Sequence, residues 1–171
     1  LLATTGLVVA GCNTVSDHSA SADSAEDRPV AVSSTPHPKA GDGMTIESMM
    51  RVGDRAWAKK DSATALRFYA MAAKEQPTNP DAYLKIGEIL RKTGRPADAI
   101  AVYERVHTFD AANIPAYHGI GYSQLQMEKP YLASRTFAEA LEFDGSNAKS
   151  LGGIAIALDK AGDHRKAQEY Y

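Results

Sequence analysis

Two consecutive stretches decide the fold, because they align with one another without an insertion or a deletion. Residues 80–113 read PDAYLKIGEILRKTGRPADAIAVYERVHTFDAAN, and residues 114–147 read IPAYHGIGYSQLQMEKPYLASRTFAEALEFDGSN. The same frame fits backwards from Pro80 to Ile46 and forwards from Ala148 to the end of the sequence. Self-similarity at a fixed spacing of this length is the signature of a repeat architecture.

Four columns of this frame keep one kind of residue. They are a small residue at position eight, an alanine at position twenty, an aromatic residue at position twenty-four and a β-branched residue at position seven: Gly53, Gly87, Gly121, Ala155; Ala65, Ala99, Ala133, Ala167; Tyr69, Tyr103, Phe137, Tyr171; and Val52, Ile86, Ile120, Ile154. Small residues let two helices approach closely, and the apolar columns supply a buried stripe at helical spacing. The pattern predicts two antiparallel helices in each repeat.

Cap and turn residues mark where these helices begin and end. Asparagine closes each full frame, where it suits the N-cap of the next helix. Proline in a first turn costs little, and glycine suits the turn after a helix. These residues are Asn79, Asn113 and Asn147 for the caps, Pro80 and Pro115 for the first turns, and Gly94 and Gly162 for the turns between helices.

These residues resemble the tetratricopeptide repeat. The resemblance implies an all-α solenoid with repeats at 46–79, 80–113 and 114–147 and a partial repeat at 148–171. Gln124 stands where the family has an apolar residue, and Glu128 replaces the glycine of the turn. Because a terminal repeat usually needs a capping helix, we expect Ile154, Leu158 and Tyr171 to be uncovered and the natural protein to continue beyond Tyr171.

An apolar stretch at the start of the sequence ends in the single cysteine, Cys12. Residues 7–12, LVVAGC, resemble the lipobox of bacterial lipoproteins, in which the peptide is cut before the cysteine and acyl chains are attached to it. Residues 1–11 are then the last part of a signal peptide. Because Asn13 is not the aspartate that retains such proteins at the inner membrane, we expect the periplasmic face of the outer membrane. The alternative is an ordinary thiol after an uncleaved segment.

Residues 12–44 are predicted to be a disordered tether behind the lipidated cysteine. From Asn13 to Gly43 the sequence is rich in Ser, Ala, Asp, Thr and Pro, and it contains no aromatic residue. Such a composition cannot bury enough apolar surface to offset the entropy of ordering the chain. The tether is expected to give the repeats reach from the membrane.

The family resemblance also implies a binding groove, because the second, fifth, ninth and twelfth positions of each first helix point into its concave face. We take ten of these residues as candidates: Met50, Asp54, Trp57, Leu84, Glu88, Arg91, His118, Tyr122, Leu125 and Ile156. Met50 and Asp54 replace the Lys and Asn of the familiar carboxylate clamp, which disfavours that mode of binding. The groove is expected to be acidic toward its N-terminal end, with Trp57, Tyr122 and Leu125 as apolar anchors. Each of these side chains could instead pack between neighbouring first helices.

Nothing in the sequence indicates catalysis, a cofactor or a metal. The histidines of the repeats are not paired on one helix face, and no nucleophile turn or glycine-rich phosphate loop is present. A formal net charge of −2 gives no reason to expect nucleic acid. Protein or peptide partners and a membrane reached through the lipid are the expected contacts.

The function favoured by these features is a non-catalytic scaffold of the bacterial envelope. A lipobox, an acidic Ser/Ala-rich tether and a short repeat array together resemble the tight-adherence (Flp) pilus assembly lipoproteins of the TadD type, which implies secretin or pilus components as partners. Two alternatives remain open at this point. One is an adaptor that recruits other partners such as peptidoglycan enzymes, and the other is a repeat module of a larger protein with a further C-terminal domain.

Overall fold

The computed structural model describes residues 43–171, and within this range it contains helices and no strand. The predicted signal segment, the lipidated Cys12 and nearly all of the tether lie outside the described residues. The helices are α1 (Ile46–Ala58), α2 (Ser62–Glu75), α3 (Pro80–Lys92), α4 (Pro96–His107), α5 (Ile114–Gln126), α6 (Pro130–Leu141), α7 (Ala148–Ala161) and α8 (His164–Gln168).

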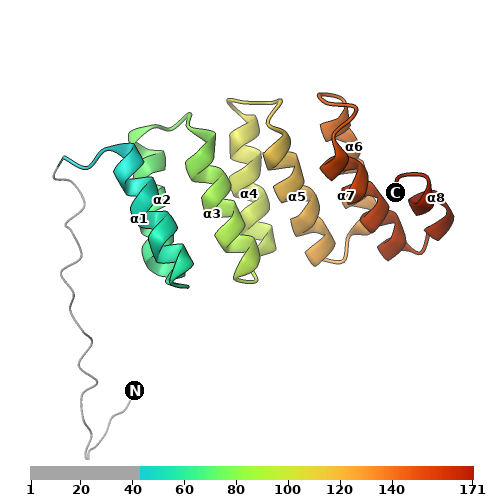
Figure 1. Cartoon of the computed structure of the whole chain (residues 1–171), viewed down its shortest axis with the longest axis horizontal. Helices are drawn as coiled ribbons and strands as arrows, with labels where there is room; N and C mark the ends of the chain where they lie inside the picture. The colour runs from blue at the N-terminus through green and yellow to red at the C-terminus, as the bar shows by residue number, and fades with distance from the viewer. Residues whose placement is uncertain (1–42) are drawn as a thin grey trace, which may run out of the picture. The chain divides into compact units, whose positions relative to one another are not determined.

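The helices keep the spacing of the sequence frame. The first helix of each repeat begins at the first residue of its frame, at Ile46, Pro80, Ile114 and Ala148. The second helices begin with the same regularity: Ser62, Pro96, Pro130 and His164. Figure 1 shows the resulting row of helix pairs, from α1 and α2 at one end to α7 and α8 at the other. The predicted all-α repeat solenoid is confirmed.

The predicted asparagine caps begin α3, α5 and α7. The Asn79 side chain accepts a hydrogen bond from the backbone N–H of Asp81 at 3.0 Å. Asn113 accepts from Ala116 at 3.0 Å, and Asn147 accepts from Ser150 at 3.1 Å. Each bond satisfies one of the N–H groups that a helix start leaves without a partner.

A left-handed residue ends each first helix. Gly94 and Gly162 have φ angles of 81° and 86°, as the sequence predicts. Lys60 and Glu128 occupy the equivalent places in the other two repeats and also have positive φ angles, of 62° and 57°. The turn therefore keeps its conformation in every repeat, whether or not a glycine is there to favour it.

Aromatic residues of the second helices pack into the space beside glycines of the first helices. A Cβ added to Gly53 would lie 2.5 Å from the Tyr69 ring, and one added to Gly121 would lie 2.6 Å from the Phe137 ring. The alanines of position twenty are fully buried at the same contacts: Ala65, Ala99, Ala133 and Ala167. Both columns thus have the packing role that the sequence predicts.

The C-terminal end of the stack corrects the expectation that Ile154 and Leu158 are uncovered. Ile154 and Leu158 are only 4% and 9% exposed, because they share a core cluster with Phe137 of α6 and Ala167 of α8. The short α8 therefore covers them. Tyr171 is 75% exposed, although its hydroxyl donates to Asp159 at 2.8 Å.

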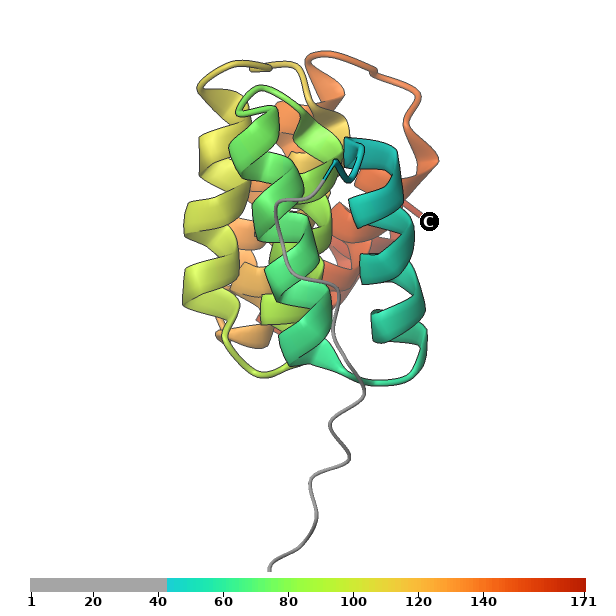
Figure 2. The same cartoon turned by 90° about the vertical axis from the view of Figure 1, so that its left-hand side faces the viewer.

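First helices of successive repeats contact one another, α3 with α5 and α5 with α7. The second helices α2, α4 and α6 each pack between the first helix of their own repeat and that of the next, and α8 packs against α7. Figure 2, which looks along the row from the α1–α2 end, shows α1 on one side of the stack and α4 on the other. This arrangement places the first helices together on one face. None of the helices between residues 43 and 171 combines the length and the apolar character needed to cross a membrane.

Candidate protein-binding groove

Side chains from α3, α5 and α7 form a pocket of about 280 Å³ on the face made by the first helices. Half of the ten predicted groove residues meet there: Leu84, Glu88, Arg91, His118 and Tyr122. Pro115 and Lys149, which occupy the second position of their repeats, complete the rim together with Tyr103 and Gly119 at its base. The helical frame thus brings residues of three repeats to one hollow.

Tyr122 is the central side chain of this pocket. Its ring packs edge-on against Phe137 of α6, with 5.2 Å between the ring centroids. Two cations lie near the ring: the Arg91 guanidinium carbon is 5.9 Å from its centroid, and the Lys149 amine nitrogen is 5.8 Å from it. Cations at this distance are attracted by the electron-rich face of an aromatic ring. The core fixes one edge of Tyr122, and the rest of the residue borders the pocket.

Arg91 lies beside the buried Tyr103 in this pocket. The Arg91 Nε atom is buried and has no hydrogen-bond partner within residues 43–171. Burial raises the pKa of the Tyr103 hydroxyl to about 12, although Arg91 opposes this shift through its charge and through a hydrogen bond to the hydroxyl. Tyr103 is therefore a neutral phenol at physiological pH.

His118 closes the pocket on the side of α7. It is 5% exposed, and its Nε2 atom lies 2.8 Å from the Ser150 hydroxyl. Burial, together with the Lys149 cation, lowers the His118 pKa to about 4. The imidazole is therefore neutral at physiological pH, so this predicted groove residue adds no charge and contributes a packed wall.

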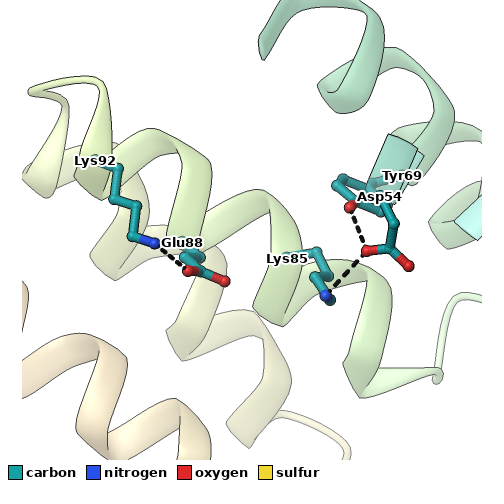
Figure 3. Close-up of polar contacts among 5 residues, drawn as sticks. All are labelled: Asp54, Tyr69, Lys85, Glu88 and Lys92. Carbon is teal, nitrogen blue, oxygen red and sulfur yellow. Dashed lines mark hydrogen bonds and ion pairs between the residues drawn. The ribbon is translucent and has the colours of Figure 1, made fainter. Parts of the chain in front are cut away.

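The predicted acidic end of the groove is corrected by the ion pairs in Figure 3. Asp54 accepts hydrogen bonds from the Tyr69 hydroxyl at 2.8 Å and from Lys85 at 3.0 Å. Burial raises the Asp54 pKa, but these two hydrogen bonds outweigh it and lower the pKa below its ordinary value. Glu88 pairs with Lys92 at 2.6 Å. Both predicted acidic groove residues are thus neutralised by lysines of α3.

Trp57 and Met50 lie at the α1 end of this face and are partly buried. Both pack against the core cluster of Ala65 and Tyr69. Lys92 lies 5.8 Å from the centroid of the Trp57 ring, so a cation also accompanies this aromatic residue. The two side chains serve the core and leave part of their surface open.

Leu125 and Ile156 differ from one another in their placement. Leu125 is 8% exposed and belongs to the core cluster of Phe137 and Ile154, so the structure does not offer it as an open anchor. Ile156 is 39% exposed on α7. The expectation for Leu125 failed because the twelfth position of this repeat turns toward α6 and α7.

Sequence reasoning missed the glycines at position six, Gly119 and Gly153. A Cβ on Gly119 would lie 2.3 Å from the Tyr103 ring, and one on Gly153 would lie 2.7 Å from the Phe137 ring. Each glycine lets the aromatic residue of the preceding repeat reach the next first helix. Glycine at the same position of two consecutive repeats was the available signal.

Comparison with known proteins agrees with this geometry. The family model described as tetratricopeptide repeat matches residues 56–120, a range that runs from the end of α1 into α5. This match covers the second repeat and parts of its two neighbours, and the helix pairs keep the same register over the whole described stack. Residues 46–171 have the fold of a tetratricopeptide-repeat solenoid.

Solved structures share this repeat fold. A crystal structure of MamA protein superposes with a TM-score of 0.63 and 26% identity, covering 74% of this chain and 69% of that one. A thermophilic TPR protein of Thermus thermophilus superposes with a TM-score of 0.65 at 15% identity, covering 74% of this chain and 71% of that one, which supports the fold alone.

Curated relatives match through their repeats. Cellulose synthase operon protein C of Komagataeibacter sucrofermentans is 26% identical over 134 residues, which is 74% of this chain and 10% of that protein. The probable UDP-N-acetylglucosamine–peptide N-acetylglucosaminyltransferase SPINDLY of Arabidopsis thaliana is 34% identical over 88 residues, covering 52% of this chain and 10% of that protein. The chain thus spans about a tenth of the length of these relatives. The repeats suggest a protein–protein interaction scaffold.

Proposed function

We propose that this protein is a non-catalytic scaffold that binds partner proteins in the groove of its first helices. The supporting observation is Tyr122, an aromatic side chain fixed against Phe137 and bordering a pocket between three helices. A rigid aromatic residue in a pocket is typical of the residues that dominate binding energy in protein interfaces. The pocket residues come from different repeats, so a segment lying across them would contact several repeats at once.

The proposed location is the bacterial envelope, with a lipid on Cys12 as the anchor and the periplasmic face of the outer membrane as the favoured site. Its support is the sequence LVVAGC of residues 7–12. Several acyl chains hold a protein stably at a membrane, because each buried methylene contributes about 0.8 kcal/mol. The proposed process is assembly of a Flp/Tad-type pilus or secretion machine, with a secretin or pilus components as partners. It rests on the resemblance of the lipobox, tether and repeats to that class of lipoprotein.

The binding proposal is tested by capture of partners from membranes with the lipidated protein and its Trp57→Ala/Tyr122→Ala variant, analysed by mass spectrometry. The variant is expected to lose the partners that the wild-type protein captures, while circular dichroism shows unchanged helix content. A matched control is Tyr131→Ala/Leu132→Ala, which removes two exposed side chains of α6 outside the pocket. Capture that survives the first pair of substitutions, or is lost equally with the second, contradicts the groove assignment.

The anchor is tested separately with Cys12→Ser. Metabolic labelling with a fatty acid should mark the wild-type protein and leave the variant unlabelled, and detergent phase partitioning should move the variant into the aqueous phase. A labelled variant, or an unlabelled wild-type protein, rules out lipid attachment at Cys12. Recovery of pilus or secretin components in the capture supports the proposed process, whereas recovery of cell-wall enzymes favours the adaptor function.

A further inference from the structure

The charge of the central pocket differs from that expected from its sequence. Its one carboxylate, Glu88, already pairs with Lys92 at 2.6 Å. Neither Arg91 nor Lys149 forms an ion pair with a carboxylate within residues 43–171. The pocket is therefore cationic, although the chain as a whole has a net charge of −2.

The two cations flank the same aromatic side chain and line the same pocket. They lie 5.9 and 5.8 Å from the same Tyr122 ring centroid, and both line the pocket. Arg91 also presents a buried Nε–H that no atom of the described residues accepts. A buried donor without a partner costs free energy, which a ligand oxygen would recover by accepting its hydrogen bond.

The other groups around the pocket do not compete for such a ligand. His118 is bonded to Ser150 and is neutral, and Tyr103 is a neutral phenol. The Tyr103 ring fills the space beside Gly119, where a Cβ would lie 2.3 Å from it. An anionic oxygen is thus the ligand group that complements this surface, and a lysine or arginine of a partner would meet two cations of the same sign.

We propose that this pocket binds the side-chain carboxylate of an aspartate or glutamate in a partner's extended segment, with Arg91 and Lys149 as its two cationic contacts and Tyr122 beside it. This proposal rests on the groove binding function proposed above and names the chemistry of its ligand. A side chain is favoured over a chain terminus because the pocket lies in the middle of the row, with the half-buried Trp57 before it and the exposed Ile156 after it. A segment that continues past the pocket in both directions can use those residues as well.

The test is an affinity selection with a defined probe. A pool of short random peptides, N-acetylated and C-terminally amidated, is passed over the immobilised full-length protein at low salt, and the retained peptides are sequenced by mass spectrometry. Retained peptides are expected to be enriched in Asp and Glu about fivefold over the input, and the enrichment should fall as salt is raised. Because the protein has a net negative charge, nonspecific attraction would not enrich acidic peptides.

Three variants show whether Arg91 and Lys149 are responsible. Arg91→Gln and Lys149→Gln should each abolish the enrichment, whereas Lys74→Gln should leave it intact, because Lys74 is exposed near the end of α2 and does not line the pocket. A second pool contains no Asp or Glu and is prepared in two forms, one with free C-terminal carboxylates and one amidated. The two forms should be retained equally. Stronger retention of the form with free C-termini would show that the pocket binds a terminal carboxylate and not a side-chain carboxylate.

The outcomes separate this proposal from the binding function itself. Retention of neutral or basic peptides that depends on Trp57 and Tyr122 overturns the acidic ligand and keeps the groove as a binding site. Acidic enrichment that persists in either the Arg91 or the Lys149 variant also overturns the proposal, because the anion then does not need both cations. If the Trp57→Ala/Tyr122→Ala variant retains the same peptides as the wild-type protein, or if neither protein retains any peptide, both proposals fail.

Discussion

At the scale of single residues, two adjacent glycines of α7 have opposite surroundings. A Cβ on Gly153 would lie 2.7 Å from the Phe137 ring, whereas nothing lies within 4 Å of one on Gly152. We expect Gly153→Ala to lower the free energy of unfolding by about 1–3 kcal/mol, because the buried ring cannot move freely. Gly152→Ala should raise it by about 0.5–1 kcal/mol, since alanine favours a helix over glycine. Urea denaturation of both variants measures these changes in the free energy of unfolding. Changes of the same sign in the two variants would contradict the different packing of Gly152 and Gly153.

His118 predicts a pH dependence of stability. Its pKa is about 4 in the folded protein and 6.5 when unperturbed, so the unfolded chain binds the proton more tightly. The free energy of unfolding should therefore be highest above pH 6.5, decrease as the pH falls toward 4, and show no further loss from this group below that value. The loss is of the order of 1–3 kcal/mol. Urea titrations across this range measure it.

His118→Gln is the control for this titration, because glutamine has no proton to gain. The carboxylates of Asp54, Asp144 and Asp159 have lowered pKa values and titrate in both proteins. The difference between the two proteins therefore isolates His118. An identical decline of stability in the variant between pH 6.5 and 4 would show that another group is responsible.

The sequence predicted which residues lie in the groove better than it predicted the charge of the groove. The repeat frame assigned Arg91 and Tyr122 to one face, and both line the pocket there, because a fixed spacing places the same positions on the same face. It gave the wrong charge because Asp54 and Glu88 were considered without their partners Lys85 and Lys92. The Glu88–Lys92 pair is a contact four residues apart that the sequence already contains. The Asp54–Lys85 pair joins two repeats, and it follows only once the helices are packed.

At the scale of the helix, the turn after each first helix gives a prediction about Glu128. This residue has a φ of 57°, a left-handed conformation that costs a residue with a Cβ about 1 kcal/mol. Glu128→Gly should therefore raise the free energy of unfolding by about 1 kcal/mol, measured by urea denaturation. Gly94→Ala is the matched reverse change, because Gly94 has a φ of 81° and nothing lies within 4 Å of an added Cβ. It should lower stability by a similar amount, and a gain there would contradict the argument.

The boundaries of the helices could be predicted because asparagine, proline and glycine act locally. Asn113 and Asn147 fix the starts of α5 and α7 through single backbone hydrogen bonds. The burial of Ile154 and Leu158 could not be predicted in this way. It depends on α8, which runs only from His164 to Gln168 but buries Ala167 completely against them. Coverage by so short a helix is a matter of packing, which a periodic pattern does not describe.

At the scale of the whole described molecule, the groove follows from how the repeats stack. First helices touch the first helices of the next repeat, α3 with α5 and α5 with α7, and so form one continuous face (Figure 1). Each repeat adds its positions to that face in the same register. A pocket lined by three helices is thus a property of the stack that no isolated repeat has.

Binding at this face is tested most directly by site-specific photo-crosslinking in the native cell. A photoreactive benzoyl-phenylalanine at position 122 keeps an aromatic ring in the pocket, and the same group at position 131 places it on an exposed residue of α6. We predict that illumination gives a covalent adduct with a partner protein from position 122 and none from position 131. Adducts from position 131 alone, or none from position 122 in cells where membrane capture succeeds, would contradict binding in the groove.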